Sequence, residues 1–191
     1  MNTTSWRPFE LRRLFNIEKG TRLTKADMTP GDIPFIGATA FNNGVTAMIG
    51  NNEVLHPANV ITVAYNGSVG EAFYQENSFW ASDDVNILYP KFKLSRNKAL
   101  FLLPLIRAVG KNYAFANKWK VDDMANSIIL LPVLNDNSPN WNFMEMFMER
   151  ELKRATETIR FFCPNAHLPK LEEPNVSSAQ TPRPNRCKGA K

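Results

Sequence analysis

Short apolar runs separated by turn residues occupy the stretch between Gly31 and Pro90. Each run is rich in β-branched or aromatic residues and is bounded by Gly, Asn, Asp or Pro, which is typical of strands joined by tight turns. The predicted strands are Ile33 to Gly37, Val60 to Tyr65, Ala72 to Gln75 and Val85 to Tyr89, with a further one from Ser127 to Val133. The segment Trp6 to Ile17 mixes large apolar and basic residues, and its periodicity does not separate a strand from a helix.

Two later segments have helical periodicity. Leu94 to Val109 places Ala99, Leu102, Leu103 and Ile106 on one face, with Ser95 as the N-cap, Pro104 inside and Gly110 at the end. Pro104 is expected to kink that helix or to leave a carbonyl unpaired. Trp141 to Phe161 is amphipathic, and Pro164 is expected to end it. Strands followed by helices predict an α+β protein.

Length and composition indicate one domain, or one domain plus an appendage. The 191 residues are 43% hydrophobic, which is enough for a real core. We expect a domain over residues 1–138, a helix over 139–163 and a disordered tail, rich in Pro and Ser, over 164–191. The longest apolar candidate, Ala99 to Val109, is interrupted by Pro and Arg, and the N-terminus lacks the apolar core of a signal peptide, so we expect a cytoplasmic protein without a membrane span. The only two cysteines, Cys163 and Cys187, argue against a disulfide or metal cage.

Charge is segregated along the chain rather than spread evenly. The net charge is +5, but residues 151–191 contribute +4 of it. Residues 51–90 contain five acids and no Lys or Arg, whereas residues 91–120 contain eight basic residues and no acid. Such segregation favours one positive face that binds phosphates, and a solvated helix surface is the alternative.

Uncharged polar groups gather in two loops, Ala38 to Gly44 (the 38–44 loop) and Tyr65 to Gly70 (the 65–70 loop). Asn offers both a donor and an acceptor to a base edge, and glycine lets backbone approach a ligand closely. Asn43-Gly44 is also a favoured type I′ turn pair, which would explain both residues without a ligand. Lys111 to Lys120 interleaves lysines with aromatics, which suits phosphate and base contacts, although a core role is the favoured interpretation for Phe115 and Trp119.

Five segments together resemble the target-recognition domain of the DNA specificity (S, HsdS) subunits of type I and related type IIB restriction-modification systems. They are KGTRLTKADM, IPFIGATAFNNGV, NVITVAYNGSVGEAFYQ, FWASDDVNILYPKF and NKWKVDDMANSIILLPV, and they fall between Trp6 and Arg150. The resemblance implies a curved mixed β-sheet with flanking helices, followed by a C-terminal assembly helix. It also implies a non-catalytic subunit that recognises one half of a split target in double-stranded DNA and directs separate methyltransferase and nuclease subunits.

One recognition domain and one helix are fewer than the two of each in a complete S subunit. A half-length S chain that forms a homodimer would restore the two-fold arrangement. A truncated or orphan S fragment, binding DNA or methyltransferase without restriction, is the alternative. The predicted assembly contacts are Trp141, Met144, Met148, Ala155 and Ile159.

The predicted DNA-binding residues combine lysines for phosphates with polar and aromatic groups for bases. They are Lys25, Thr39, Asn42, Asn43, Tyr65, Asn66, Ser68, Lys111, Tyr113 and Lys118. No catalytic residue, cofactor or metal is predicted. Ser68 lacks the glycine two positions before it that a nucleophile elbow needs, and Asp83-Asp84 lacks a third carboxylate in a matching context, so a strand-entry turn is the favoured interpretation there.

Overall fold

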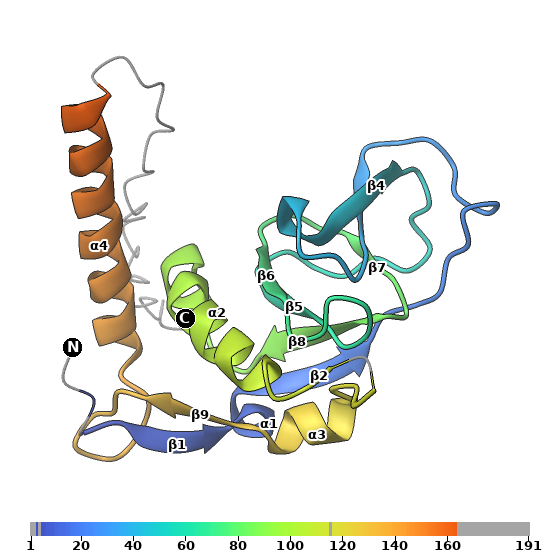
Figure 1. The fold of residues 1–191 in the computed structure, drawn as a ribbon. Helices are drawn as coiled ribbons and strands as arrows, with labels where there is room; N and C mark the ends of the chain where they lie inside the picture. The colour runs from blue at the N-terminus through green and yellow to red at the C-terminus, as the bar shows by residue number, and fades with distance from the viewer. Residues whose placement is uncertain (1–2, 4, 115, 164–191) are drawn as a thin grey trace, which may run out of the picture. The chain divides into compact units, whose positions relative to one another are not determined.

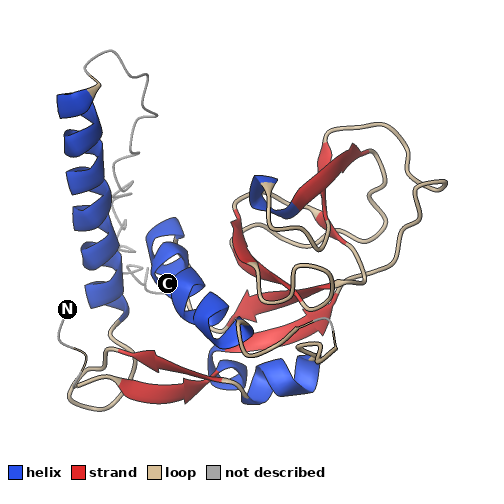
Figure 2. Cartoon of the chain, in the orientation of Figure 1, coloured by secondary structure: helices blue, strands red, loops and turns tan. Residues whose placement is uncertain are grey.

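The computed structural model of the protein describes residues 3, 5–114 and 116–163. The chain divides into two units, Met1–Lys153 and Arg154–Lys191. The first unit holds every strand of the described residues and all but one of the helices in full (Figure 1), and strands and helices are both well represented in it (Figure 2). The predicted α+β class is confirmed. The predicted disordered tail, Phe115 and Cys187 lie outside the described residues.

A four-stranded antiparallel sheet forms the centre of the first unit. Its strand order is β2 (Phe15–Lys19), β8 (Val85–Pro90), β5 (Val60–Ala64) and β6 (Ala72–Gln75). Alternate residues of the two inner strands enter two different cores. Ile61, Val63 and Leu88 pack on the side of α2 (Arg96–Gly110), whereas Val60, Val85 and Ile87 pack with Ile36 and Phe79 on the other side. Burial on both faces explains why these strands are predominantly apolar in the sequence.

Two smaller sheets accompany it, so the mixed β structure that the resemblance implied is divided among three sheets. One is mixed: β3 (Ile33–Ile36) pairs antiparallel with β4 (Val45–Ile49) and parallel with β7 (Trp80–Ala81). The other is an antiparallel ribbon of β1 (Arg7–Glu10) and β9 (Ile128–Leu131). Pairing joins strands that are far apart in the chain, and local composition does not specify such partners.

The helices follow the predicted pattern with one exception. In α2 the Ser95 side chain caps the N-terminus by accepting from the Lys98 amide at 3.2 Å, and the predicted apolar face is buried. The helix continues through the exposed Pro104 to Gly110. The exception is α3 (Val121–Asn126), in a segment for which the sequence analysis predicted no helix. The fully buried side chain of Met124 anchors this short helix in the core.

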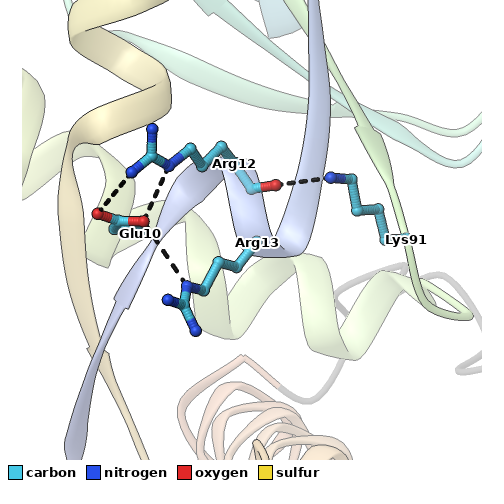
Figure 3. Close-up of polar contacts among 4 residues, drawn as sticks. All are labelled: Glu10, Arg12, Arg13 and Lys91. Carbon is cyan, nitrogen blue, oxygen red and sulfur yellow. Dashed lines mark hydrogen bonds and ion pairs between the residues drawn. The ribbon is translucent and has the colours of Figure 1, made fainter.

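A short helix, α1 (Leu11–Leu14), joins the β1–β9 ribbon to the central sheet. Figure 3 shows the polar contacts around it: Glu10 accepts from Arg12 at 2.9 Å and pairs with Arg13 at 3.6 Å, and Lys91 donates to the Arg12 carbonyl at 2.7 Å. The hydrogen bond from Arg12 lowers the pKa of Glu10. Lys91, the first of the eight basic residues in 91–120, therefore takes part in holding this junction together.

The last helix, α4 (Trp141–Phe162), begins inside the first unit. Trp141 stacks on Phe92 with ring centroids 3.8 Å apart, and the Ser95 hydroxyl bonds to Glu145. Met144 is fully buried in the same core as α2. Because these contacts tie the first turns of α4 to the core of the first unit, that unit extends past residue 138, the end of the domain expected from the sequence.

Candidate functional site

The two polar loops touch each other in the fold. The Ser68 amide donates to the Ala38 carbonyl at 3.3 Å. Gly67 has a φ of 60°, and a Cβ at this position would lie 2.7 Å from the Ala38 oxygen. Only glycine accommodates both the backbone conformation and the close approach. The 38–44 loop, which connects β3 to β4, therefore lies against the 65–70 loop, which connects β5 to β6.

The 65–70 loop also meets the end of α2. A Cβ on Gly70 would lie 2.8 Å from the Gly110 Cα, and a Cβ on Gly110 would lie 2.5 Å from the Gly70 Cα. Beyond Gly110 the chain turns back, so that Tyr113 stacks on the fully buried Trp119 with ring centroids 5.3 Å apart. A continuous series of contacts thus runs from the 38–44 loop to the basic segment 111–120. Trp119 is therefore a core residue, which agrees with the core role that the sequence analysis gave as an interpretation for it.

The Asn66 side chain is held within the protein. Its Nδ2 donates to the Asp84 carboxylate at 2.8 Å, and the Tyr65 amide donates to the Asp84 carbonyl at 3.1 Å. Asp83 and Asp84 form the turn that enters β8, which confirms the strand-entry interpretation. The Asn66 Oδ1 is buried and has no hydrogen-bond partner among the described residues. The amide nitrogen of Asn66 therefore fastens the 65–70 loop to this turn.

The turn in the 38–44 loop is centred one residue earlier than the sequence predicted. Asn42 and Asn43 have φ values of 50° and 52°, and the Gly44 amide donates to the Phe41 carbonyl at 2.9 Å. The central pair of the type I′-like turn is therefore Asn42-Asn43 and not Asn43-Gly44. Asn43 Nδ2 donates to the Tyr74 carbonyl at 3.0 Å, which ties the turn to β6.

Asn42 and Thr39 also make contacts inside the loop. Asn42 Nδ2 donates to the Val45 carbonyl at 3.2 Å, and the Thr39 hydroxyl accepts from the Phe41 amide at 3.3 Å. Asn42 is exposed and Thr39 is half-buried. Both therefore shape the loop, and a DNA contact by either remains a prediction.

Substitution of Asn42 by Gly separates these two roles. Glycine adopts a φ of 50° without strain but lacks the amide, whereas alanine lacks the amide and also disfavours the turn by about 1 kcal/mol. We expect Asn42→Gly to fold like the wild type and Asn42→Ala to be less stable in urea unfolding. Base preference, measured on a panel of duplexes, should change equally in both variants if the amide contacts a base. Preference retained in Asn42→Gly would assign Asn42 to the turn alone.

Basic groups flank the two loops unevenly. Lys19, at the end of β2, lies over the Tyr65 ring, 5.4 Å from its centroid. A hydrogen bond with Tyr65, assisted by the charges of Asp83 and Asp84, raises the pKa of Lys19. Arg22 pairs with Asp83 at 3.7 Å, and Lys111 is exposed directly after α2. Each of these three cations thus adjoins the 65–70 loop or a segment bound to it.

Two of the predicted lysines are placed differently from Lys111. Lys25 lies in an exposed turn whose neighbour Asp27 accepts from Asn51, at the opposite end of the β3–β4 hairpin from the 38–44 loop. Lys118 is half-buried next to Trp119. Of the predicted residues, the structure therefore leaves only Lys25 apart from these linked segments. The residues that lie in them are Thr39, Asn42, Asn43, Tyr65, Asn66, Ser68, Lys111, Tyr113 and Lys118.

Sequence reasoning missed two residues of this region. Phe41, at the tip of the 38–44 loop, has 78% of its surface exposed, and Lys19 reaches Tyr65 from a different strand. An aromatic residue beside two asparagines was a visible signal for Phe41. No local signal indicates Lys19, because its role depends on the pairing of β2 with β8.

The predicted assembly residues divide into two groups. Trp141, Met144 and Met148 pack against the core of their own chain, so they have a structural role. Ala155 and Ile159, in the second unit, are exposed. Phe143 and Met146 add exposed apolar surface to the first half of α4.

A family model, the type I restriction modification DNA specificity domain, matches residues 4–159. The chain belongs to this family. The specificity subunit S.BcgI of a type II restriction enzyme from Heyndrickxia coagulans is 42% identical over 147 residues, covering 76% of this chain and 43% of that protein. The chain therefore spans less than half the length of the curated relative that it matches.

Solved specificity subunits share the fold at low sequence identity. The S subunit of a type I system from M. genitalium matches with a TM-score of 0.56 at 14% identity, covering 83% of this chain and 42% of that one. The HsdS subunit from Thermoanaerobacter tengcongensis matches with a TM-score of 0.58 at 15% identity, covering 84% and 40%. The similarity to S subunits predicted from the sequence is confirmed.

Within residues 3, 5–114 and 116–163, no cluster of three or more His, Cys, Asp or Glu side chains is arranged to hold a metal ion. In the same part of the chain, no helix combines the length and the apolarity needed to cross a membrane.

Proposed function

We propose that this specificity domain binds double-stranded DNA and recognises base sequence through the 38–44 and 65–70 loops. The contact between Ser68 and Ala38 carries the proposal, because it makes one surface of two uncharged loops that are far apart in the chain. Hydroxyl and amide groups suit base edges, and a shared rigid support fixes their spacing. Family membership agrees with this use of the surface.

The flanking cations would hold the phosphates. Lys19 and Lys111 lie beside the loops, and phosphate contacts set the register of a protein on a duplex while base contacts specify sequence. The two carboxylates of the turn that enters β8 are both engaged, since Asp83 pairs with Arg22 and Asp84 accepts a hydrogen bond from Asn66. Repulsion of the DNA backbone by these two carboxylates is thereby reduced.

The proposed role in the cell is non-catalytic. The chain would recognise one half of a split target in the cytoplasm, where the DNA is, and position a separate methyltransferase subunit and a restriction subunit. Residues 1–138 would recognise DNA, and the helix within 139–163 would serve assembly. The exposed Ala155 and Ile159 would contact a partner chain or a second copy. We propose a homodimer for this second case, since two copies present two recognition surfaces.

Methylome sequencing tests this proposal directly. The chain is expressed together with a methyltransferase subunit of a restriction-modification system from the same genome, and genomic methylation is compared with that of cells lacking the chain. A new methylated motif that depends on the chain is the expected result. DNA binding in vitro without any new methylation would favour the orphan-fragment alternative, and failure of the chain to bind any duplex would refute DNA recognition.

Lys111→Ala tests the phosphate contact. Loss of one phosphate contact should weaken binding to all sequences alike and reduce the slope of log Kd against log salt by about 1. Lys93→Ala is the matched control, because Lys93 is an exposed lysine near the opposite end of the 15-residue helix α2. Titrations at several salt concentrations measure both slopes. An unchanged slope for Lys111→Ala, or an equal change for the two variants, would remove Lys111 from the interface.

A further inference from the structure

Phe41 stands out as an apolar side chain held in solvent. At 78% exposure it is the most exposed large apolar residue among the described residues of the first unit, and the next is Met146 at 59%. Single exposed apolar residues are common on protein surfaces, so exposure alone decides nothing. The conformation of the surrounding loop supplies the further observation.

The loop that presents Phe41 is ordered by several contacts. The Phe41 amide donates to the Thr39 hydroxyl, and its carbonyl accepts from the Gly44 amide at 2.9 Å. Two consecutive asparagines follow with positive φ, in the left-handed region that asparagine tolerates better than most residues other than glycine. The contact of Asn43 with the Tyr74 carbonyl anchors this turn from outside the loop. The protein thus fixes Phe41 in an exposed position.

The surroundings of Phe41 contain few charges. Residues 33–52 include no Asp, Glu, Lys or Arg, and the 65–70 loop beside them is also uncharged. An uncharged loop tip has no electrostatic attraction to the phosphates of the DNA backbone. The interior of a groove, by contrast, exposes apolar surfaces of the bases. Phenylalanine contacts thymine methyl groups in the major groove, and apolar wedges insert between base pairs in kinked duplexes.

We propose that Phe41 enters a groove of the bound duplex and makes an apolar contact with a base. This inference rests on the proposed function and deepens it, because it assigns part of the specificity to an uncharged aromatic group. The contact would depend little on salt, unlike those of Lys19 and Lys111. It is either with a thymine methyl group or with the faces of two bases at an opened step.

The test begins with the wild-type chain, whose preferred duplex is selected from a random library. Dissociation constants of wild type, Phe41→Ala and Phe41→Leu are then measured on that duplex at several salt concentrations. We expect Phe41→Ala to weaken binding by about 10- to 100-fold with an unchanged salt slope, and Phe41→Leu to weaken it less. Met48→Ala, which removes another exposed apolar side chain from the same hairpin, should bind like the wild type.

Two modified duplexes separate the base contacts. If Phe41 touches a thymine methyl group, replacing that thymine by uracil weakens the wild type and leaves Phe41→Ala unaffected. If Phe41 opens a base step, 2-aminopurine at that step becomes more fluorescent with the wild type than with Phe41→Ala. Either result supports the proposal.

Other outcomes overturn it. Phe41→Ala within twofold of wild type shows that the side chain does not contact DNA. Weakened binding with neither duplex signature and with a lowered thermal midpoint assigns Phe41 to loop stability. A wild-type chain that selects no sequence refutes the proposed function together with this inference, so the two failures are distinguishable.

Discussion

Trp119→Ala should lower the free energy of unfolding by about 3–5 kcal/mol, the range for truncating a buried Trp. The Trp119 side chain is fully buried, and its Nε1 donates to the Ser127 hydroxyl at 3.0 Å. It also stacks on Tyr113 and lies beside Gly110. Removing the indole leaves a cavity where α2, α3 and segment 111–120 meet. Urea unfolding followed by circular dichroism measures the loss.

Trp119→Phe is the matched control. It keeps most of the ring and the Tyr113 stack but loses the hydrogen bond to Ser127, for which we expect about 1 kcal/mol plus a smaller packing loss. Equal stability of Trp119→Ala and wild type would show that Trp119 does not support this part of the core. Such a result would also remove the link between the core and Tyr113.

Removing the Trp119 indole should also displace segment 111–120, which belongs to the proposed DNA-binding surface. Tyr113 and Lys111 are placed by the chain reversal that ends on Trp119. Under conditions where the variant is still folded, we therefore expect weaker DNA binding than in Trp119→Phe. The comparison separates general unfolding from local displacement of segment 111–120.

Patterns that burial imposes locally were predicted correctly from the sequence. β5 and β8 are predominantly apolar because both of their faces are covered, and α2 shows its buried stripe and its Ser95 cap. Each of these signals depends on residues within a few positions of one another. The helix from Trp141 was predicted for the same reason, and it ends one residue later than expected among the described residues.

Features that depend on distant partners were not predicted. β4 and β7 are short, and they exist as strands because they pair with β3 on its two sides. β1 and β9 lie at opposite ends of the first unit's sequence, and their pairing sets the ribbon. The helical turn α3 depends on the burial of Met124 in a core built by other elements. The local sequence of each element does not predict these long-range contacts.

The candidate site shows the same division. The sequence identified both polar loops, because glycines and amides cluster there. It did not show that the side-chain amides of Asn43 and Asn66 donate hydrogen bonds to the Tyr74 carbonyl and the Asp84 carboxylate. Nor did it show which lysines adjoin the loops: Lys19 reaches Tyr65 through strand pairing, whereas Lys25 lies at the far end of a hairpin. The sequence is the same whether the amide of a loop asparagine binds a base or the backbone of its own chain.

Gly110→Ala is expected to disturb the contact between the 65–70 loop and α2. A Cβ on Gly110 would lie 2.5 Å from the Gly70 Cα and 3.1 Å from Trp119 Cζ3. Backbone cannot rotate away as a side chain can, so the loop must move, at a cost of about 1–3 kcal/mol for overpacking. Alanine is otherwise a better helix residue than glycine, which makes a loss of stability diagnostic of the clash.

Ala108→Gly, an exposed site in the same helix turn, provides the control with the opposite change. It should cost about 0.5–1 kcal/mol by helix propensity and leave DNA binding unchanged. Gly110→Ala should lower both stability and base discrimination, since displacing Gly70 moves Ser68 and with it the contact to Ala38. Stability and discrimination are measured by urea unfolding and by competition between duplexes. Reduced stability with full discrimination would mean that the two loops hold their relative position without α2.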